Sequence, residues 1–243
     1  MPVFAMPAAA LEGGTPLAAG AVSRGTVAIQ AVAPQPDGTA RVSECTGVLV
    51  APDRVLTAAH CLDEASAPQH VAVFFFDGPK AVPPYAPVAA ILRHPGHVKG
   101  WARRKGNIET RQTEISSDLA VLRLASPAPA GRAPLPLGGT GRPDILTVLG
   151  AGMDGPDGRS GTLKSAPLGN IRHTRSGPQL AFATPGRARI CRGDSGGPVL
   201  GPDGKIWGIS GAILRGEGGC SGRAVVVPVN TGDPAIRTLL DAR

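Results

Sequence analysis

Short apolar segments recur along the chain, and turn-forming Gly, Pro and Asp residues separate them. The segments are TVAIQAV (26–32), TGVLV (46–50), HVAVFFF (70–76), LAVLRL (119–124), DILTVLG (144–150), IWGISGAIL (206–214) and AVVVPV (224–229). Segments of this length, rich in Val and Ile and bounded by turn residues, are typical of β-strands. The pattern therefore predicts an all-β protein built from many short strands.

One proline-rich stretch interrupts this series of predicted strands. Its sequence is ASPAPAGRAPLPL, and proline is poorly tolerated in a central strand. We therefore interpret residues 126–136 as a connector between two halves of the chain.

The end of the chain has a different pattern, which predicts a helix at about residues 233–242. Asp233 can cap the helix, and Pro234 suits its first position. The helical repeat would place three apolar side chains on one face: Ile236, Leu239 and Leu240.

The composition is that of a folded globular protein. Of the 243 residues, 42% are hydrophobic and 18% are charged, which excludes an intrinsically disordered chain. Only 3% are aromatic, so the core must consist mainly of aliphatic side chains. No segment approaches the roughly 18 apolar residues of a membrane-spanning helix, and we expect no membrane association.

The net charge of +7 raises the question of an anionic partner such as nucleic acid. The cations are scattered, however, except in the segment at 99–112, KGWARRKGNIETRQ. The chain has no recognition-helix pattern and no interleaving of basic and aromatic residues suited to stacking bases. We interpret 99–112 as a solvated surface loop and expect no nucleic-acid partner.

The chain contains four cysteines, which allow three complete pairings. They form no Cys-x-x-Cys motif and no Cys/His cluster with zinc-site spacing, so we expect no metal. The number of cysteines alone leaves two disulfides or four buried thiols open.

Three short motifs contain the residue types that serine-based hydrolysis requires. VLTAAHCL contains His60, SSDLAVLRL contains Asp118, and CRGDSGGPVL contains Ser195. A hydroxyl must attack, an imidazole must accept its proton near neutral pH, and a carboxylate must orient the imidazole. Each motif alone also fits an ordinary turn or cap, so the hypothesis rests on all three occurring together.

With these motifs in the order His, Asp, Ser, the chain resembles the chymotrypsin-like (trypsin-fold) serine proteases. RHPGH (93–97) is similar to the His-Pro loop of that family, and LEGGTP (11–16) is similar to its mature N-terminus. The predicted final helix also matches the family. The resemblance spans roughly residues 11–243 and is strongest at the three motifs.

The resemblance implies two six-stranded antiparallel β-barrels with the active site in the cleft between them, followed by a C-terminal α-helix. The first barrel would span about 11–125 and the second about 137–230, joined by the connector at 126–136. His60 and Asp118 would come from the first barrel, and Ser195 from the second. We interpret residues 1–10 as the remainder of an export or pro segment.

The resemblance also implies a role for each site residue. Ser195 would be the nucleophile, His60 the general base and Asp118 the residue that orients it. The backbone N–H groups of Gly193 and Ser195 would form the oxyanion hole. Asp194 would pair with the α-amino group of Leu11, and we hypothesise that removal of the export signal after Ala10 creates this group.

The cysteine pairing implied by the resemblance is Cys45–Cys61 and Cys191–Cys220. Two disulfides fit an oxidising compartment, so we expect a secreted or periplasmic protein. The family also implies a monomer that acts on protein or peptide substrates without a cofactor.

The specificity pocket departs from the trypsin pattern. The residue six positions before the nucleophile lies at the base of the primary pocket, where Asp selects Lys or Arg, and here it is Arg189. An inward guanidinium, supported by Arg223, would favour acidic side chains. If Arg189 turns outward or pairs with Glu217, a small or apolar preference results. Ser210 and Gly211 would belong to the substrate-binding edge strand, which lacks the family's tryptophan.

Two other function classes remain open at this stage. The altered edge strand is compatible with a binding protein that has the protease fold but no proteolytic activity. The basic segment at 99–112 is compatible with a binder of nucleic acid or of anionic surfaces. The three motifs favour a secreted serine endopeptidase over both.

Overall fold

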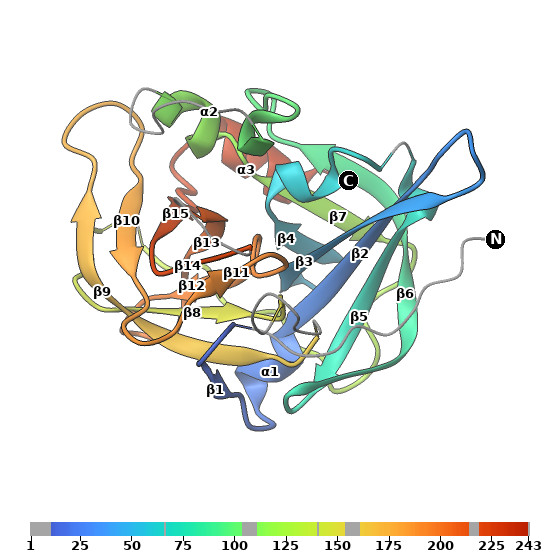
Figure 1. Cartoon of the computed structure of the whole chain (residues 1–243), viewed down its shortest axis with the longest axis horizontal. Coiled ribbons are helices and arrows are strands. Elements are labelled where there is room, and N and C mark those ends of the chain that lie inside the picture. Colours follow the sequence, from blue (N-terminus) through green and yellow to red (C-terminus); the bar gives the residue numbers. More distant parts are fainter. Residues whose placement is uncertain are drawn as a thin grey trace.

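A computed structural model of the chain describes residues 11–65, 67–103, 111–139, 141–153, 161–213 and 219–242. Strands dominate, and they form two closed antiparallel barrels of six strands each, followed by a C-terminal helix. The barrels lie side by side in Figure 1, the first in blue to green and the second in yellow to red. This is the fold class that the sequence analysis predicts.

The first barrel closes in the order β2-β3-β4-β7-β6-β5. Its strands are β2 (Thr26–Pro34), β3 (Ala40–Ala51), β4 (Arg54–Thr57), β5 (Val71–Asp77), β6 (Lys80–Arg93) and β7 (Ala120–Leu124). Residues 71–76 of β5 are all buried, so both faces of this strand are covered. The three consecutive phenylalanines of β5 supply much of the aromatic content of an otherwise aliphatic core.

The second barrel closes in the order β8-β9-β10-β15-β13-β12, because β8 pairs with both β9 and β12. Its strands are β8 (Leu146–Gly150), β9 (Lys164–His173), β10 (Ala181–Thr184), β12 (Pro198–Leu200), β13 (Ile206–Ile213) and β15 (Ala224–Pro228). A short strand near the N-terminus, β1 (Thr15–Pro16), pairs with β9, so the first described residues belong to this barrel. A separate two-stranded pairing joins β11 (Ile190–Cys191) to β14 (Cys220–Ser221).

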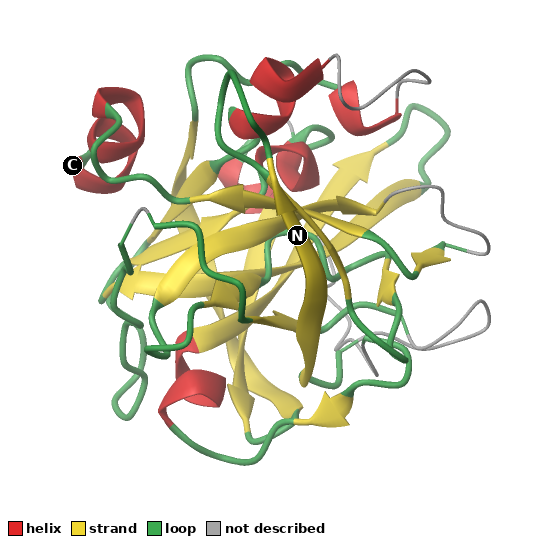
Figure 2. Cartoon of the chain, turned by 90° about the vertical axis from the view of Figure 1, so that its left-hand side faces the viewer, coloured by secondary structure: helices red, strands yellow, loops and turns green. Residues whose placement is uncertain are grey.

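The helices lie around the strands and not within the barrels (Figure 2). Those named below are α2 (Gln112–Ser116), the 3₁₀ helix η1 (Ala59–Leu62) and the C-terminal α3 (Pro234–Asp241). α3 begins as the sequence predicts, since the Asp233 side chain accepts a hydrogen bond from the Ala235 amide. No helix in the described part of the chain is long and apolar enough to cross a membrane.

The proline-rich segment 126–136, all of which is described, contains no helix or strand. It follows the first barrel closely, because the Ala128 amide donates to the Pro52 carbonyl and the Leu135 amide donates to the Leu49 carbonyl. These bonds hold the segment against β3 and the turn after it as the chain passes toward the second barrel.

Candidate active site

His60 lies on η1, the short helix that follows β4. A carboxylate oxygen can only accept, so the contact of 2.7 Å between His60 Nδ1 and Asp118 Oδ2 places a proton on Nδ1. The backbone amide of His60 donates to Asp118 Oδ1 at 2.8 Å. The Asp118 side chain is fully buried, whereas 17% of the His60 side chain is exposed. With the proton on Nδ1, Nε2 is the nitrogen of the neutral imidazole that keeps its lone pair.

Asp118 lies in the short link between α2 and β7. Its own amide donates to the Ile115 carbonyl, and its carbonyl accepts from the Ala59 amide. The segment carrying Asp118 is thus bonded directly to η1. This fixes the carboxylate relative to His60 through the backbone as well as through the side chain.

Ser195 lies in a tight loop between β11 and β12 that only glycine permits. Gly193 and Gly196 both have positive φ angles, of 95° and 81°. A Cβ atom at Gly193 would collide with Gly152, and one at Gly196 would collide with Thr57 and with the Thr46 carbonyl. The glycine-rich sequence around Ser195 is therefore a requirement of this conformation.

Hydrogen bonds hold every carbonyl of the loop from Arg192 to Ser195. In that order, the four oxygens accept from the Met153 amide, the Thr46 hydroxyl, the Gly197 amide and the Thr46 amide. In a trans peptide the N–H points opposite to the C=O. The N–H groups of Gly193 and Ser195 consequently point away from these donors, and within the described residues neither donates to a protein acceptor.

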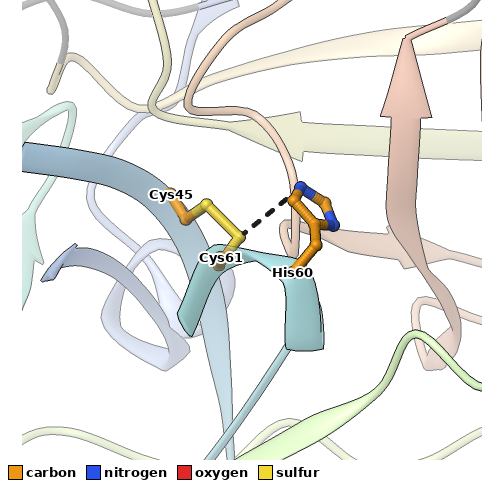
Figure 3. A group of neighbouring side chains, drawn as sticks. All are labelled: Cys45, His60 and Cys61. Carbon is orange, nitrogen blue, oxygen red and sulfur yellow. Dashed lines mark hydrogen bonds between the residues drawn. A yellow bond between two sulfur atoms is a disulfide. The ribbon is translucent and has the colours of Figure 1, made fainter. Parts of the chain in front are cut away.

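Cys61 lies between His60 and Ser195. Its Sγ lies 4.0 Å from His60 Nε2 and 3.7 Å from the Ser195 carbonyl oxygen. Figure 3 shows the disulfide of Cys45 and Cys61 beside the imidazole ring. Because both sulfurs are in a disulfide, they cannot act as thiolate metal ligands with His60. Through Cys61, η1 of the first barrel contacts the serine loop of the second barrel.

The structure contains two disulfides, and they join the cysteines that the family resemblance pairs. Cys45–Cys61 ties β3 to η1, and Cys191–Cys220 ties β11 to β14. The described residues include no free cysteine.

The Asp194 side chain is fully buried and packs against Gly150 and Gly152 at the end of β8. Its two oxygens accept from the Gly152 amide at 2.8 Å and from the Cys191 amide at 2.7 Å. The backbone amide of Leu11, whose side chain is also fully buried, is a third donor. Burial raises the pKa of Asp194 to about 7, although the three amide bonds and the charge of Lys164 act in the opposite direction.

A second His–Asp pair lies next to the first, and no sequence motif predicted a role for it. His97 Nε2 lies 2.7 Å from Asp63 Oδ1, and His97 Nδ1 lies 3.7 Å from Asp118 Oδ1. Both side chains of this pair are almost completely buried. Burial would raise the pKa of Asp63, but hydrogen bonds from His97 and the Gly100 amide lower it below its ordinary value. The sequence offered one signal for each residue: His97 ends the motif RHPGH, and Asp63 lies three residues after His60.

Trp101 is another neighbour of His60, and no sequence motif predicted it. Its ring packs edge-on against His60 with the ring centroids 5.9 Å apart, and the side chain is buried. The guanidinium of Arg111 lies 5.7 Å from the centre of the same ring. These contacts restrict the imidazole on one side.

Arg189 is engaged with the N-terminal segment. Its Nη1 lies 3.0 Å from Glu12 Oε2, and its Nη2 donates to the Cys220 carbonyl at 3.1 Å. Arg223 is exposed, and no contact between it and Arg189 is found in the described part of the chain. The possible partner Glu217 lies outside the described residues.

Ser210 and Gly211 lie on β13, next to the serine loop. The Ser210 amide donates to the Gly197 carbonyl, and the Ser210 carbonyl accepts from the Gly196 amide. The Ser210 hydroxyl is buried and has no partner among the described residues. Ser210 therefore fixes one side of the loop through its backbone.

Two closed six-stranded antiparallel barrels are the chymotrypsin fold of serine proteases. A His–Asp pair lies at the first barrel, and a serine in a glycine loop lies at the second. A family model described as Trypsin matches residues 29–236. The chain belongs to the trypsin family, whose members act on proteins and peptides. No curated protein matches the chain at a significant level.

Proposed function

We propose that this protein is a secreted serine endopeptidase that cleaves peptide bonds through Ser195, His60 and Asp118. The hydrogen bond between His60 Nδ1 and Asp118 Oδ2 is the observation that carries the proposal. It holds the imidazole in the tautomer that a general base requires. The neighbouring serine loop supplies two backbone N–H groups without a protein acceptor among the described residues.

In the proposed reaction, His60 Nε2 removes the proton from the Ser195 hydroxyl as its oxygen attacks the scissile carbonyl. The negative charge on the tetrahedral intermediate is stabilised by the N–H groups of Gly193 and Ser195. His60 then gives the proton to the leaving amine, and an acyl-enzyme remains on Ser195. Water, activated by the same imidazole, releases the acyl group. Asp118 stabilises the imidazolium at both stages.

We also propose that cleavage after Ala10 activates the protein. The group that faces buried Asp194 in the uncut chain is the neutral amide of Leu11. Leu11 has a φ of 38°, which is unfavourable for leucine, and cutting the preceding peptide bond removes this constraint. The new ammonium group would form an ion pair with Asp194, which precedes Ser195 in the loop. Residues 11–243 would then form the mature protease domain.

The two disulfides support a location outside the reducing cytosol. Substrates are proteins or peptides, and the proposed mechanism requires neither a cofactor nor a metal, since groups of the chain and water supply every step. An arginine at position 189 argues against a trypsin-like preference for Lys or Arg.

A digest of a proteome-derived peptide library, read by mass spectrometry, tests the proposal. The chain with Ser195→Ala is the matched control, because it removes only the proposed nucleophile. New peptide termini in the first sample and none in the control would support an endopeptidase. If the protein starting at Leu11 gives no new termini and its serine does not react with a fluorophosphonate, the binding-protein alternative is favoured.

A further inference from the structure

The charge of Arg189 is matched by a carboxylate from a distant part of the sequence. Glu12 and Arg189 form an ion pair of 3.0 Å, in which about a third of each side chain is exposed. The Glu12 carboxylate also lies close to the disulfide of Cys191 and Cys220, within 4.8 Å of both sulfurs. The Glu12 carboxylate therefore lies beside the disulfide that joins β11, the strand before the serine loop, to β14.

The backbone fixes Glu12 in this place. The Arg189 amide donates to the Glu12 carbonyl at 2.9 Å, and the two residues form an antiparallel β-bridge. On one side of Glu12, the Leu11 side chain is completely buried. On the other side, Gly13 has a φ of 70°, which allows the chain to turn directly after the bridge. Glu12 is thus held at Arg189 by its own main chain and by both neighbours.

The guanidinium is occupied at both ends. One terminal nitrogen bonds Glu12, and the other bonds the Cys220 carbonyl. The family resemblance implies that Arg189 lies at the base of the primary pocket. A substrate carboxylate that entered that pocket would have to displace Glu12 from Arg189 or lie beside a like charge. An uncharged substrate side chain leaves the ion pair of Glu12 and Arg189 intact and brings no like charge next to Glu12.

Building on the proposed function, we propose that Glu12 is a specificity-determining residue. By compensating Arg189 at the base of the primary pocket, it makes the enzyme select uncharged P1 side chains over acidic ones. The segment that carries Leu11 to Asp194 therefore also completes the substrate pocket.

The test uses the protein cleaved after Ala10, which is the form proposed above to be active, in four versions: unchanged, Glu12→Gln, Arg189→Gln, and both changes together. The substrates are peptides that differ only at P1, which is Leu, Glu or Lys. In the unchanged protein, kcat/KM should be higher for Leu than for Glu. Glu12→Gln leaves the arginine charge uncompensated, so the Glu/Leu ratio should rise about tenfold or more. Arg189→Gln leaves the Glu12 charge uncompensated and should raise cleavage after Lys.

The double variant is the matched control, because it removes both charges and keeps both hydrogen-bonding side chains. Its Glu/Leu ratio should return close to that of the unchanged protein. A ratio that Glu12→Gln does not raise, or an unchanged protein that prefers Glu, would overturn the proposal. If Glu12→Gln fails to fold, the gain of Lys cleavage in Arg189→Gln decides the matter.

Equilibrium binding separates this inference from the proposed function. The same peptides are titrated by fluorescence anisotropy into Ser195→Ala protein, once with Glu12 in place and once with the added change Glu12→Gln. A rise in affinity for the Glu peptide upon Glu12→Gln supports the pocket assignment even if the chain with Ser195 cleaves nothing, in which case only the proposed function fails. Cleavage without any change in the Glu/Leu pattern contradicts the pocket assignment alone.

Discussion

His97 Nε2 lies 2.7 Å from Asp63 Oδ1, so a second buried His–Asp pair lies directly behind the pair of His60 and Asp118. The Asp63 carboxylate is further held by the Gly100 amide at 2.7 Å. The other nitrogen of His97 faces Asp118, which stands between the two imidazoles. The loop that carries His97 thus supports the proposed catalytic carboxylate from the side opposite to His60.

Replacing His97 should destabilise the fold strongly. His97→Leu leaves the Asp63 carboxylate buried without this partner, and breaking a buried pair costs about 3–5 kcal/mol. For a chain of this size, each kcal/mol lowers Tm by about 2–4 °C. Thermal unfolding of His97→Leu, Asp63→Leu and the double variant measures the coupling. If the two single losses simply add in the double variant, the pair contributes nothing.

Replacing Asp118 should abolish most of the activity without unfolding the protein. Asp118→Asn keeps the size of the side chain, but its amide can stabilise the wrong imidazole tautomer. By analogy with other triads, kcat should fall about 10⁴-fold. The measurement is kcat on a peptide substrate, with circular dichroism as the folding control. Activity within about tenfold of the unchanged protein would contradict the assigned role of Asp118.

Much of the fold is visible in the sequence because most strands are apolar and rich in β-branched residues. β6 is not, since it contains Pro83, Pro84 and Pro87, and the apolar pattern did not predict it. The register with β5 explains how Pro83 and Pro84 are accommodated: Val73 pairs with Ala86 and Phe75 pairs with Val82, so residues 83–85 form a bulge. Pairing with neighbouring strands makes this segment a strand, and such pairing depends on the tertiary structure.

The site was predictable to a similar extent. The candidate triad residues were singled out because three motifs occur together in one chain, and the structure places two of them, His60 and Asp118, in contact. The partner of Arg189 could not be predicted, since Glu12 lies 177 positions away and only the folded chain brings the two together. The role of Thr46 was hidden for the same reason, as its motif is an ordinary strand sequence.

The Thr46 hydroxyl should affect catalysis through the serine loop. It donates to the Gly193 carbonyl at 2.8 Å and accepts from the Ala151 amide at 2.9 Å, and it is completely buried. Thr46→Val keeps the shape but leaves both groups unsatisfied, at a cost of about 1–3 kcal/mol for each group. The peptide plane that follows Gly193 would then lose its anchor.

We expect Thr46→Val to lower kcat about tenfold with little change in KM, because the loop supports the transition state more than substrate binding. Thr46→Ser retains the hydroxyl and is the matched control, with near-normal kcat. Steady-state kinetics on one peptide measures both constants. Equal kcat in the valine and serine variants would exclude a role of the hydroxyl in the loop.

Whether the peptide bond before Leu11 is cut should control how the free energy of unfolding depends on pH. In the uncut chain the pKa of Asp194 is raised from 3.8 to about 7. The folded state therefore binds the proton more tightly than the unfolded state, and the free energy of unfolding falls as the pH rises from about 4 to 7. The total loss is about 4 kcal/mol, since each pKa unit corresponds to about 1.4 kcal/mol. The Asp194 contribution is fully present only below about pH 4.

In the form that begins at Leu11, the ammonium group should lower the pKa of Asp194 and remove this loss. The free energy of unfolding of this form should exceed that of the uncut chain by an amount that grows from about pH 4 to 7. The difference should decline as the ammonium group deprotonates near pH 8. Urea unfolding of both forms at several pH values measures the difference. The uncut chain with Asp194→Asn is the control, because it cannot titrate and should lose the dependence. Parallel pH curves for the two forms would show that the Leu11 ammonium does not reach Asp194.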